Sequence, residues 1–500
     1  MRVLRLLTLL VLLPAGASAQ DAAPPAISLT PPNTKLFDAA SLSRALGPLP
    51  NVRFDRPYAQ VGSQTLDMKG RACAGCPRRS LATPLLDTLW LNIMYNSINR
   101  ASHDATADID PHVWWANMKS GFEWDNNPWP VNQIGHPYQG SNYFNAGRAN
   151  GLGFYGSAAV AAFGSSTWEY FFENNRASFN DLINTTLGGI ALGEVFHRVA
   201  WVVRDPMSEG RKKKELIALA IDPIGGLTRM VNGDAKRVTA KPPTMTPSSI
   251  RYSLAGGVMW QGKSLDQVDG QGLVIIDMAV AYGNTREQRS TVPFGSFDAM
   301  FSVGGGGQTR TGIRGRLFGT PFGGHYQFNL LQTFDFIKNP AYDYGGQGLD
   351  LEVGMTRQIF SDTTLWMAGA GGLTMLGAVN QLAPPPVIEG EKAATGGGAD
   401  GSRDYDYGPG FRWSGFIQMS RASQPYFTIA YQGYHVAVVD GVRSNHVLQR
   451  LFLDARVPVR YSLSIGVAGE YFFRKAYFYS GSNGTDESPQ LRAYIAWSSK

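Results

Sequence analysis

The spacing of hydrophobic and polar positions changes once along the chain, near residue 250. Before this point, hydrophobic residues recur at intervals of three and four, which is the period of an amphipathic helix. After it they alternate with polar residues, which is the period of a strand with two different faces. The sequence therefore predicts a mixed fold, with an N-terminal α-helical domain followed by a C-terminal β domain.

Four segments before the change carry the helical pattern. They are residues 85–100, 151–173, 178–205 and 210–233, and the last is expected to break at Pro223. Ser178 is predicted to cap the third helix. Asp181 lies three residues further on, where a carboxylate suits both the cap and the helix dipole. Together these segments predict a compact helical domain over residues 85–235.

The alternating pattern is clear in residues 461–471, where Leu463, Ile465 and Val467 share one face and Ser464 and Glu470 share the other. A soluble β-sandwich also alternates in this way. However, the strands are about ten residues long, which is the length that a tilted strand needs to cross a bilayer. We count roughly twelve strands, with aromatic residues near their ends. Residues 250–500 therefore predict an antiparallel transmembrane β-barrel.

The polar face of these strands repeats Arg, Asp and Gln. In a barrel of this size the inward side chains largely fill the lumen, so we expect no wide pore. In the alternative of a narrow solute channel, these inward Arg, Asp and Gln side chains would line the lumen. The longest loop, residues 381–410, is rich in Pro, Gly and charge and is expected outside the cell.

The N-terminal residues resemble a secretion signal. Arg2 and Arg5 precede an apolar run that is too short to span a bilayer, and a small-residue cleavage motif ends at Ala19. Residues 1–19 are therefore predicted to be a signal peptide, and residues 20–84 a Pro- and Ala-rich leader with an irregular segment. Cys73 and Cys76 are predicted to form a local disulfide, because the surroundings fit neither a thioredoxin-like, a haem nor a zinc site.

Composition narrows the function classes. Only 17% of the residues are charged and the net charge is +6, with no extended patch of basic and aromatic residues. Nucleic-acid binding is therefore not expected. The dense basic run Arg211–Lys214 is either a solvated helix face or a contact to anionic lipid headgroups.

One polar and aromatic stretch, "NQIGHPYQGSNYFNAGRANG" (132–151), leads to a family resemblance. With "FEWDNNPWPV" before it and "STWEYFFE" and "SFNDLINTTLGGIALGE" after it, the segment of about residues 122–205 resembles the bacterial envelope domain-of-unknown-function family numbered 3943. The resemblance implies an envelope location and a barrel after the helices, but no activity. A weaker similarity to VanZ-like helical membrane proteins lies in the order of Glu169, Arg176, Asp181, Asn184 and Gly188.

The same segment holds the candidate catalytic residues His136, Glu169 and Asp181. A carboxylate in the apolar helix around Glu169 is costly to bury without a partner, and its pKa is expected to rise as in general acids and bases. In the alternative interpretation these residues form a buried hydrogen-bond network that only stabilises the fold. His136 would then lie in a turn before Pro137, and Glu169 would pair with Arg148.

The candidate binding residues of the segment are polar or aromatic, namely Asn132, His136, Tyr138, Asn145, Arg148 and Asn184. Tyr138 would otherwise pack the bundle or rest at a membrane interface. The histidines are too scattered for a metal-ligand spacing such as H-E-x-x-H, so no metal and no cofactor are expected.

The sequence thus predicts an outer-membrane β-barrel protein with its helical domain on the periplasmic side. Its expected role is that of an envelope scaffold or a lipid- or cell-wall-binding protein rather than an enzyme. The expected partners are outer-membrane lipid and a periplasmic or cell-wall component. Two alternatives stay open: an envelope hydrolase acting on lipid or peptidoglycan through Glu169 and His136, and a narrow solute channel.

Overall fold

The computed structural model describes most of the chain from residue 82 onward. The described residues are 60–61, 64–65, 82–204, 211–236, 245–266, 270–284, 290, 292–382, 403–421, 424–460, 462–479, 481 and 483–499. The predicted signal peptide, most of the leader and the Cys73–Cys76 pair lie outside these ranges, so the disulfide stays a prediction.

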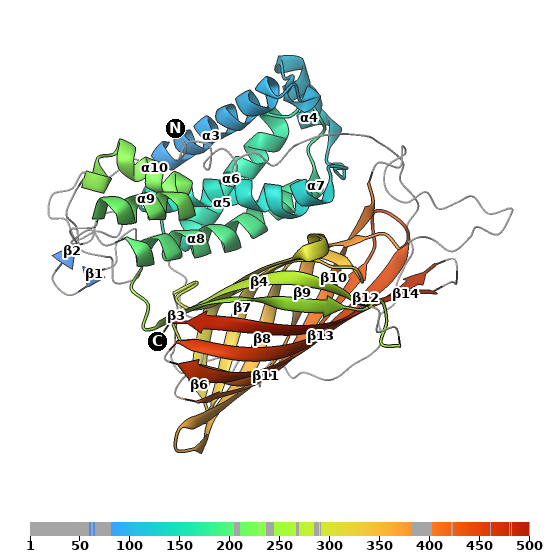
Figure 1. The fold of residues 1–500 in the computed structure, drawn as a ribbon. Coiled ribbons are helices and arrows are strands. Elements are labelled where there is room, and N and C mark those ends of the chain that lie inside the picture. The colour runs from blue at the N-terminus through green and yellow to red at the C-terminus, as the bar shows by residue number, and fades with distance from the viewer. Residues whose placement is uncertain are drawn as a thin grey trace.

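Helices occupy the first half of the described chain (Figure 1). Their bounds are α3 Ala82–Ala101, η1 Ala105–Ala107, α4 Pro111–Ser120, η2 Val131–Gly135, α5 His136–Ala149, α6 Phe154–Phe171, α7 Phe179–Ile183, η3 Asn184–Gly188, α8 Gly189–Val203, α9 Arg211–Ile221, α10 Pro223–Val231 and η4 Asp234–Lys236. The break at Pro223 and the cap at Ser178 are as expected, because the Ser178 hydroxyl accepts a bond from the Asp181 amide at 3.3 Å. The helix over 178–205 contains a π-helical turn, η3.

The stretch 132–151 is helical, and the expectation of a turn at His136 was wrong. Residues Val131–Ala149 form the π-helical turn η2 and the helix α5. Glycine is a poor helix former, but here it permits close packing. A Cβ added at Gly140 would lie 1.7 Å from the carbonyl oxygen of Thr185. Tertiary contact with η3 therefore outweighs local propensity in this segment.

The second half forms a closed antiparallel barrel of twelve strands in meander order, which confirms the predicted fold class. The strands are β3 Ile250–Gln261, β4 Gln271–Tyr282, β5 Phe297–Gly304, β6 Thr309–Phe322, β7 Tyr326–Lys338, β8 Asp343–Phe360, β9 Thr363–Asn380, β10 Tyr405–Arg421, β11 Gln424–Ala437, β12 Ser444–Arg460, β13 Leu463–Phe478 and β14 Asn483–Ser498. A two-residue pair, β1 Gln60–Val61 and β2 Gln64–Thr65, lies apart from the barrel. The expected loop 381–410 is shorter than predicted, because β10 begins at Tyr405 and pairs there with Asn380.

The two faces of the strands differ as the alternation predicts. Contacts between strands that are not neighbours cross the lumen, as when Arg310 of β6 meets Glu470 of β13. The alternate positions, such as Leu453, Ile465 and Val467, are exposed and aliphatic. The barrel is therefore polar and charged inside and apolar outside.

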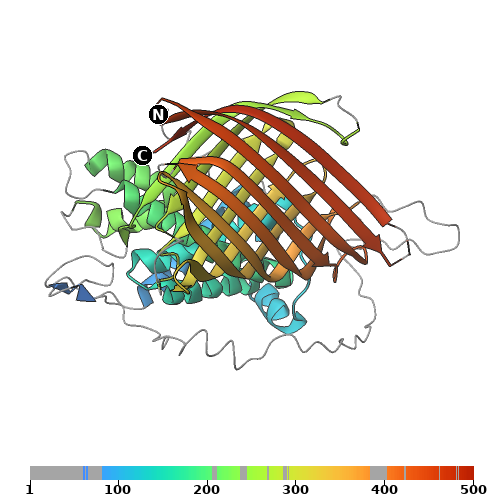
Figure 2. The same ribbon diagram turned by 90° about the horizontal axis from the view of Figure 1, so that it is seen from below.

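The helical domain packs against the outer wall of the barrel. In Figure 1 the helices lie along the barrel, and Figure 2, from below, shows them behind it. Leu192 and Val195 of α8 share a hydrophobic core with Phe297, Ile313 and other outward side chains of β4 to β10. Ile313 also points outward, on the face of β6 opposite Arg314, but it is buried beneath α8.

Candidate functional site

The three candidate catalytic side chains come from three helices that meet beside the barrel. His136 begins α5, Glu169 lies near the end of α6, and Asp181 belongs to α7. Each side chain is at most 4% exposed. In this conformation a substrate in solution cannot touch any of them.

His136 and Asp181 are neighbours, whereas Glu169 has a different partner. The Nε2 atom of His136 lies 3.5 Å from Asp181 Oδ1, and its Nδ1 atom lies 3.3 Å from the hydroxyl of Thr185. Glu169 Oε2 accepts a bond from the backbone amide of Ser178 at 2.7 Å. The hypothesis that pairs Glu169 with His136 as acid and base therefore lacks its central contact.

The expected ion pair between Glu169 and Arg148 was wrong. Arg148 lies at the far end of α5, where its Nε atom is 2.9 Å from Glu194 Oε2 of α8. Glu194 also accepts a bond from Arg198 at 2.7 Å. The packing of α5 against α8 decides this partner choice, and sequence spacing does not report it.

Burial shifts the pKa values of His136, Glu169 and Asp181, which we call the His136 cluster. Desolvation raises the pKa of Glu169 and of Asp181 well above their ordinary values, and nearby carboxyl groups, Glu173 and Asp125 among them, add to both shifts. Desolvation lowers the pKa of His136 to about 4. Burial thus favours the protonated form of both carboxyl groups and the neutral form of the imidazole. Such groups donate and accept hydrogen bonds but supply no ionised base.

The stability of the helical domain is expected to depend on pH in both directions. Carboxyl groups with raised pKa stabilise the fold fully at low pH, and this contribution is lost as pH rises toward the folded values, which for Glu173 is about 8. His136 contributes fully above its unfolded pKa, and the contribution is lost as pH falls toward 4. Thermal melting of the helical signal should therefore weaken as pH rises from about 6.5, where the His136 contribution is complete, toward about 8. Glu169→Gln should flatten that decline by up to about 1.4 kcal/mol per pH unit.

Glu123→Gln is the matched control for this measurement, because Glu123 is partly exposed and lies 4.0 Å from Arg176. It should leave the decline of melting temperature with rising pH unchanged. An equal decline in the parent and in Glu169→Gln would show that Glu169 does not titrate in this range.

The polar residues next to the cluster connect the helical domain to the barrel. Asn132 donates to the hydroxyl of Tyr405 at 2.7 Å and to Asp125 at 2.9 Å. Gln133 and Asn180 each donate to the hydroxyl of Tyr407 at 3.1 Å. We call Asn132, Gln133, Asn180, Tyr405 and Tyr407 the polar interface. It holds η2 and the start of α7 to the first residues of β10.

The other predicted binding residues fall into two places. Asn184 donates to the carbonyl of Asn132 at 3.1 Å and so supports the polar interface. Tyr138 packs edge-on against Phe196, Asn145 is buried in α5, and Arg148 belongs to the Glu194 network. The six residues therefore do not converge on one surface, and their contacts are structural.

Sequence reasoning missed Asp125, Asn180 and the two tyrosines of the polar interface. Trp124 stacks on Tyr407 with ring centroids 5.4 Å apart, and Arg403 donates to the carbonyl of Asp125 at 3.3 Å. The one available signal was "SRDYDYG", a basic and aromatic run that ends the long loop. Its partners lie more than 200 residues earlier, so no local pattern identifies them.

The lumen carries two layers of side chains. One layer is aromatic and aliphatic, with Tyr344 and Tyr434 packed 4.3 Å apart between their ring centroids. The other is ionic. Glu470 contacts Arg310, Arg450 and Arg492, while Arg412 contacts Asp335 and, at 3.1 Å, Asp350. These residues belong to seven different strands. Side chains from opposite walls thus meet across the interior.

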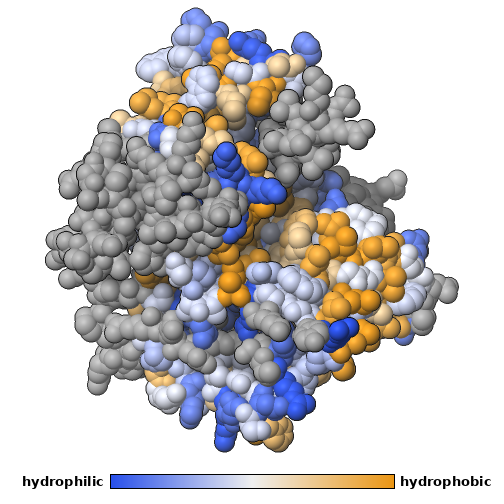
Figure 3. Space-filling view, turned by 60° about the vertical axis from the view of Figure 1, so that its left-hand side comes forward, coloured by the Kyte–Doolittle hydropathy of each residue, from blue (hydrophilic) through white to orange (hydrophobic). Residues whose placement is uncertain are grey.

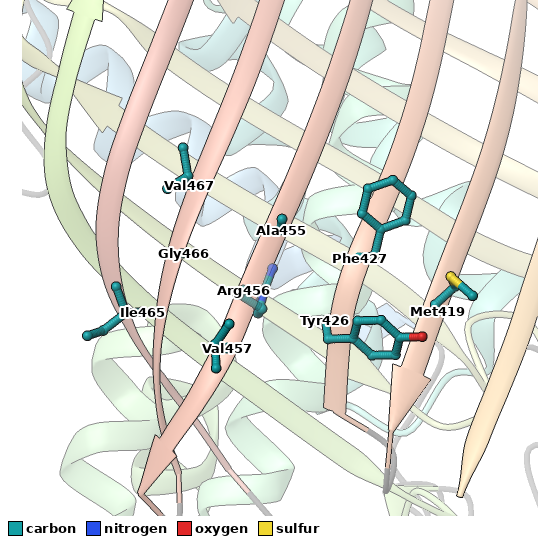
Figure 4. A pocket seen from close by; sticks show the side chains of 9 residues that line it. All are labelled: Met419, Tyr426, Phe427, Ala455, Arg456, Val457, Ile465, Gly466 and Val467. Atoms are coloured by element: carbon teal, nitrogen blue, oxygen red, sulfur yellow. The ribbon is translucent and has the colours of Figure 1, made fainter. Parts of the chain in front are cut away.

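A shallow apolar hollow of about 550 Å³ lies on the outer wall of β10 to β13 (Figure 4). It is lined by Met419, Tyr426, Phe427, Ala455, Arg456, Val457, Ile465, Gly466 and Val467. Arg456 is its charged member, and its guanidinium pairs with Asp454 at 2.7 Å. The hollow is continuous with the aliphatic outer wall and offers no converging polar groups.

The described residues contain neither a group of metal-binding side chains nor a membrane-spanning helix. Across the described residues, no three His, Cys, Asp or Glu side chains are grouped so that they could hold a metal ion. No helix in the described ranges is both long enough and apolar enough to cross a membrane.

Comparison with known proteins identifies a family whose model matches part of the chain. Residues 121–224 match the model of the family described as Domain of unknown function (DUF3943), which confirms the predicted family for this part of the chain. No curated protein matches the chain.

Similar solved structures cover about half of this chain. The NanC porin is 8% identical, with 49% of this chain and 98% of that chain covered and a TM-score of 0.26. The KdgM porin is 8% identical, with 50% and 99% covered and a TM-score of 0.24. The toluene transporter TodX of Pseudomonas putida is 7% identical, with 51% and 90% covered and a TM-score of 0.20. Scores this low carry no argument about function.

Proposed function

We propose that this chain is an outer-membrane β-barrel protein in which the barrel is a closed anchor and the helical domain is an envelope scaffold that binds lipid or cell-wall material. The observation that supports the proposal is the contrast between the two faces of the barrel. Leu453, Val457 and Ile495 are among many exposed aliphatic side chains on its outer wall. A closed barrel with an apolar exterior satisfies its backbone groups internally, as a protein surrounded by lipid must.

The barrel ends suggest an orientation. The connections at residues 323–325 and 361–362 are short and lie at the same end as the last strand residue, Ser498; the longer connection 283–296 is the exception at this end. Short turns of outer-membrane barrels face the periplasm, and long loops such as the one before Tyr405 face outward. In this orientation the end of the helical domain formed by α9 and α10 lies toward the periplasm, since Figure 1 places these helices on the side of the C-terminus.

The buried clusters support anchoring and scaffolding more than catalysis or transport. His136, Glu169 and Asp181 are enclosed, and the adjacent polar interface binds the barrel. In the lumen, Glu470 and Arg412 join strands that are not adjacent. These contacts favour a rigid unit of barrel and helices that presents its outer surface to partners.

We expect the purified chain to produce no conductance steps in planar bilayers. The reason is that the ionic and aromatic layers fill the lumen from opposite walls. The measurement is single-channel recording over a range of voltages, with a general porin in the same bilayers as the positive control. Heat-modifiable gel migration of the same sample should report a folded barrel.

Reproducible steps from the folded sample would overturn the closed-anchor proposal and favour the narrow channel. A sample that resists folding into lipid vesicles, while a standard barrel protein folds under the same conditions, would contradict the membrane location itself.

A further inference from the structure

Helix α3 has its polar and apolar faces reversed with respect to a water-soluble protein. Its outward face carries Leu86 and Trp90, which are 63% and 64% exposed, together with Ile93. Its inward face carries Thr88 and Asn92, both fully buried. A helix on the surface of a soluble domain normally turns its hydrophobic stripe inward. The reversal needs a physical reason.

The buried amides of α3 are satisfied inside the domain. Asn92 accepts a bond from the Tyr143 hydroxyl and donates to Thr167 at 2.9 Å. Asn96 donates to the carbonyls of Ala107 at 3.1 Å and Phe172 at 3.0 Å. The polar groups of this helix therefore bond to neighbouring helices and loops, as polar groups do when lipid surrounds a bundle.

Other helices of the bundle also expose large hydrophobic side chains. Tyr155 of α6, Phe179 of α7 and Trp115 of α4 are exposed, whereas the central helix α5 buries Asn142 and Asn145. Figure 3 shows hydrophobic residues on one face of the molecule, both at the height of the helices and lower down, at the height of the barrel. The apolar surface is thus a property of the domain rather than of one helix.

Close backbone packing inside the bundle points in the same direction. A Cβ at Gly189 would lie 2.4 Å from the backbone carbon of Gly140, and one at Gly193 would lie 2.8 Å from the ring of Phe144. Gly189 and Gly193 form a G-x-x-x-G motif. Small residues at helix contacts are characteristic of association in lipid, where burial of apolar surface gives no driving force.

The reversed surface is continuous with the outer wall of the barrel. The helical domain lies along that wall (Figures 1 and 2), and exposed Leu349, Leu351 and Leu373 occupy β8 and β9 beside the covered region. A bilayer that surrounds the barrel therefore reaches the helices as well.

We propose that lipid acyl chains cover the outward faces of α3 and α6, so that the helical domain lies beside the barrel within the membrane without crossing it. The inference rests on the proposed membrane location of the barrel and identifies the partner of the apolar surface. The exposed Lys212 and Lys213 of α9 then mark the level of anionic headgroups.

Site-directed nitroxide labels in lipid vesicles test this proposal. In a full-length background with Cys73→Ser and Cys76→Ser, single cysteines replace Trp90 on α3, Val467 on the barrel wall or Lys213 on α9. The measurement is the ratio of collision rates with oxygen, which concentrates in acyl chains, to those with a water-soluble nickel chelate. We expect a ratio above one at positions 90 and 467 and below one at position 213.

The positions separate the two proposals. A ratio below one at position 90 with a ratio above one at 467 would overturn the lipid contact of α3 and leave the barrel in the membrane. Ratios below one at both would overturn the proposed function as well. Low collision rates with both reagents at position 90 would mean that protein, either a partner or a second copy, covers α3, and would also overturn the proposal.

Discussion

Glu470→Gln is expected to destabilise the barrel by about 3–5 kcal/mol, which is the range for breaking a buried ionic network by removing one member. Glu470 is buried in the lumen, and its carboxylate meets the guanidinium groups of Arg310, Arg450 and Arg492. The amide keeps the size of the side chain but removes its negative charge. Three cations would then remain close together, with Asp277 at 3.5 Å from Arg492 as a weak counter-charge.

Urea unfolding of the barrel in lipid vesicles, followed by heat-modifiable migration, measures this loss. Glu352→Gln is the matched control, because it makes the same change in the same lumen. Glu352 pairs with a single arginine, Arg314 at 2.9 Å, which retains some exposure, so the control should lose about 1 kcal/mol or less. Equal losses in the two variants would mean that the arginines of the Glu470 cluster are solvated.

The barrel was predictable because alternation is local. Each strand reports its own two faces, so Leu463, Ile465 and Glu470 could be assigned without knowing which strands pair. What alternation cannot report is whether an outward face meets lipid or protein. Ile313 follows the pattern of Val467, yet α8 covers it.

The candidate site was predictable only in part, because its contacts are long-range. The residues of the stretch 132–151 were recognised as unusual, but their helical state depends on the close approach of Gly140 to Thr185. The polar interface depends on Tyr405 and Tyr407, which the chain reaches only after seven strands of the barrel. The amphipathic pattern of α3 was visible, but a pattern alone does not tell which face is inside.

Glu194→Gln is expected to destabilise the helical domain by about 3–5 kcal/mol while the barrel stays folded. Glu194 is fully buried on α8 and bonds Arg148 of α5 at 2.9 Å and Arg198 at 2.7 Å. Arg198 in turn donates to the carbonyl of Pro293 at 3.0 Å and lies over the ring of Tyr282. One carboxylate thus holds two helices together and orients the arginine that reaches the barrel.

Hydrogen–deuterium exchange locates this effect, and Glu215→Gln is its matched control. Glu215 also bonds two buried arginines, Arg204 at 3.3 Å and Arg229 at 2.8 Å, but these contacts stay within the helical domain. Both variants should raise exchange in their own helices, and only Glu194→Gln should raise it around Pro293. Unchanged exchange at the amides that follow Pro293, such as that of Phe294, in Glu194→Gln would mean that the apolar contacts of α8 and the polar interface suffice to hold the bundle on the barrel.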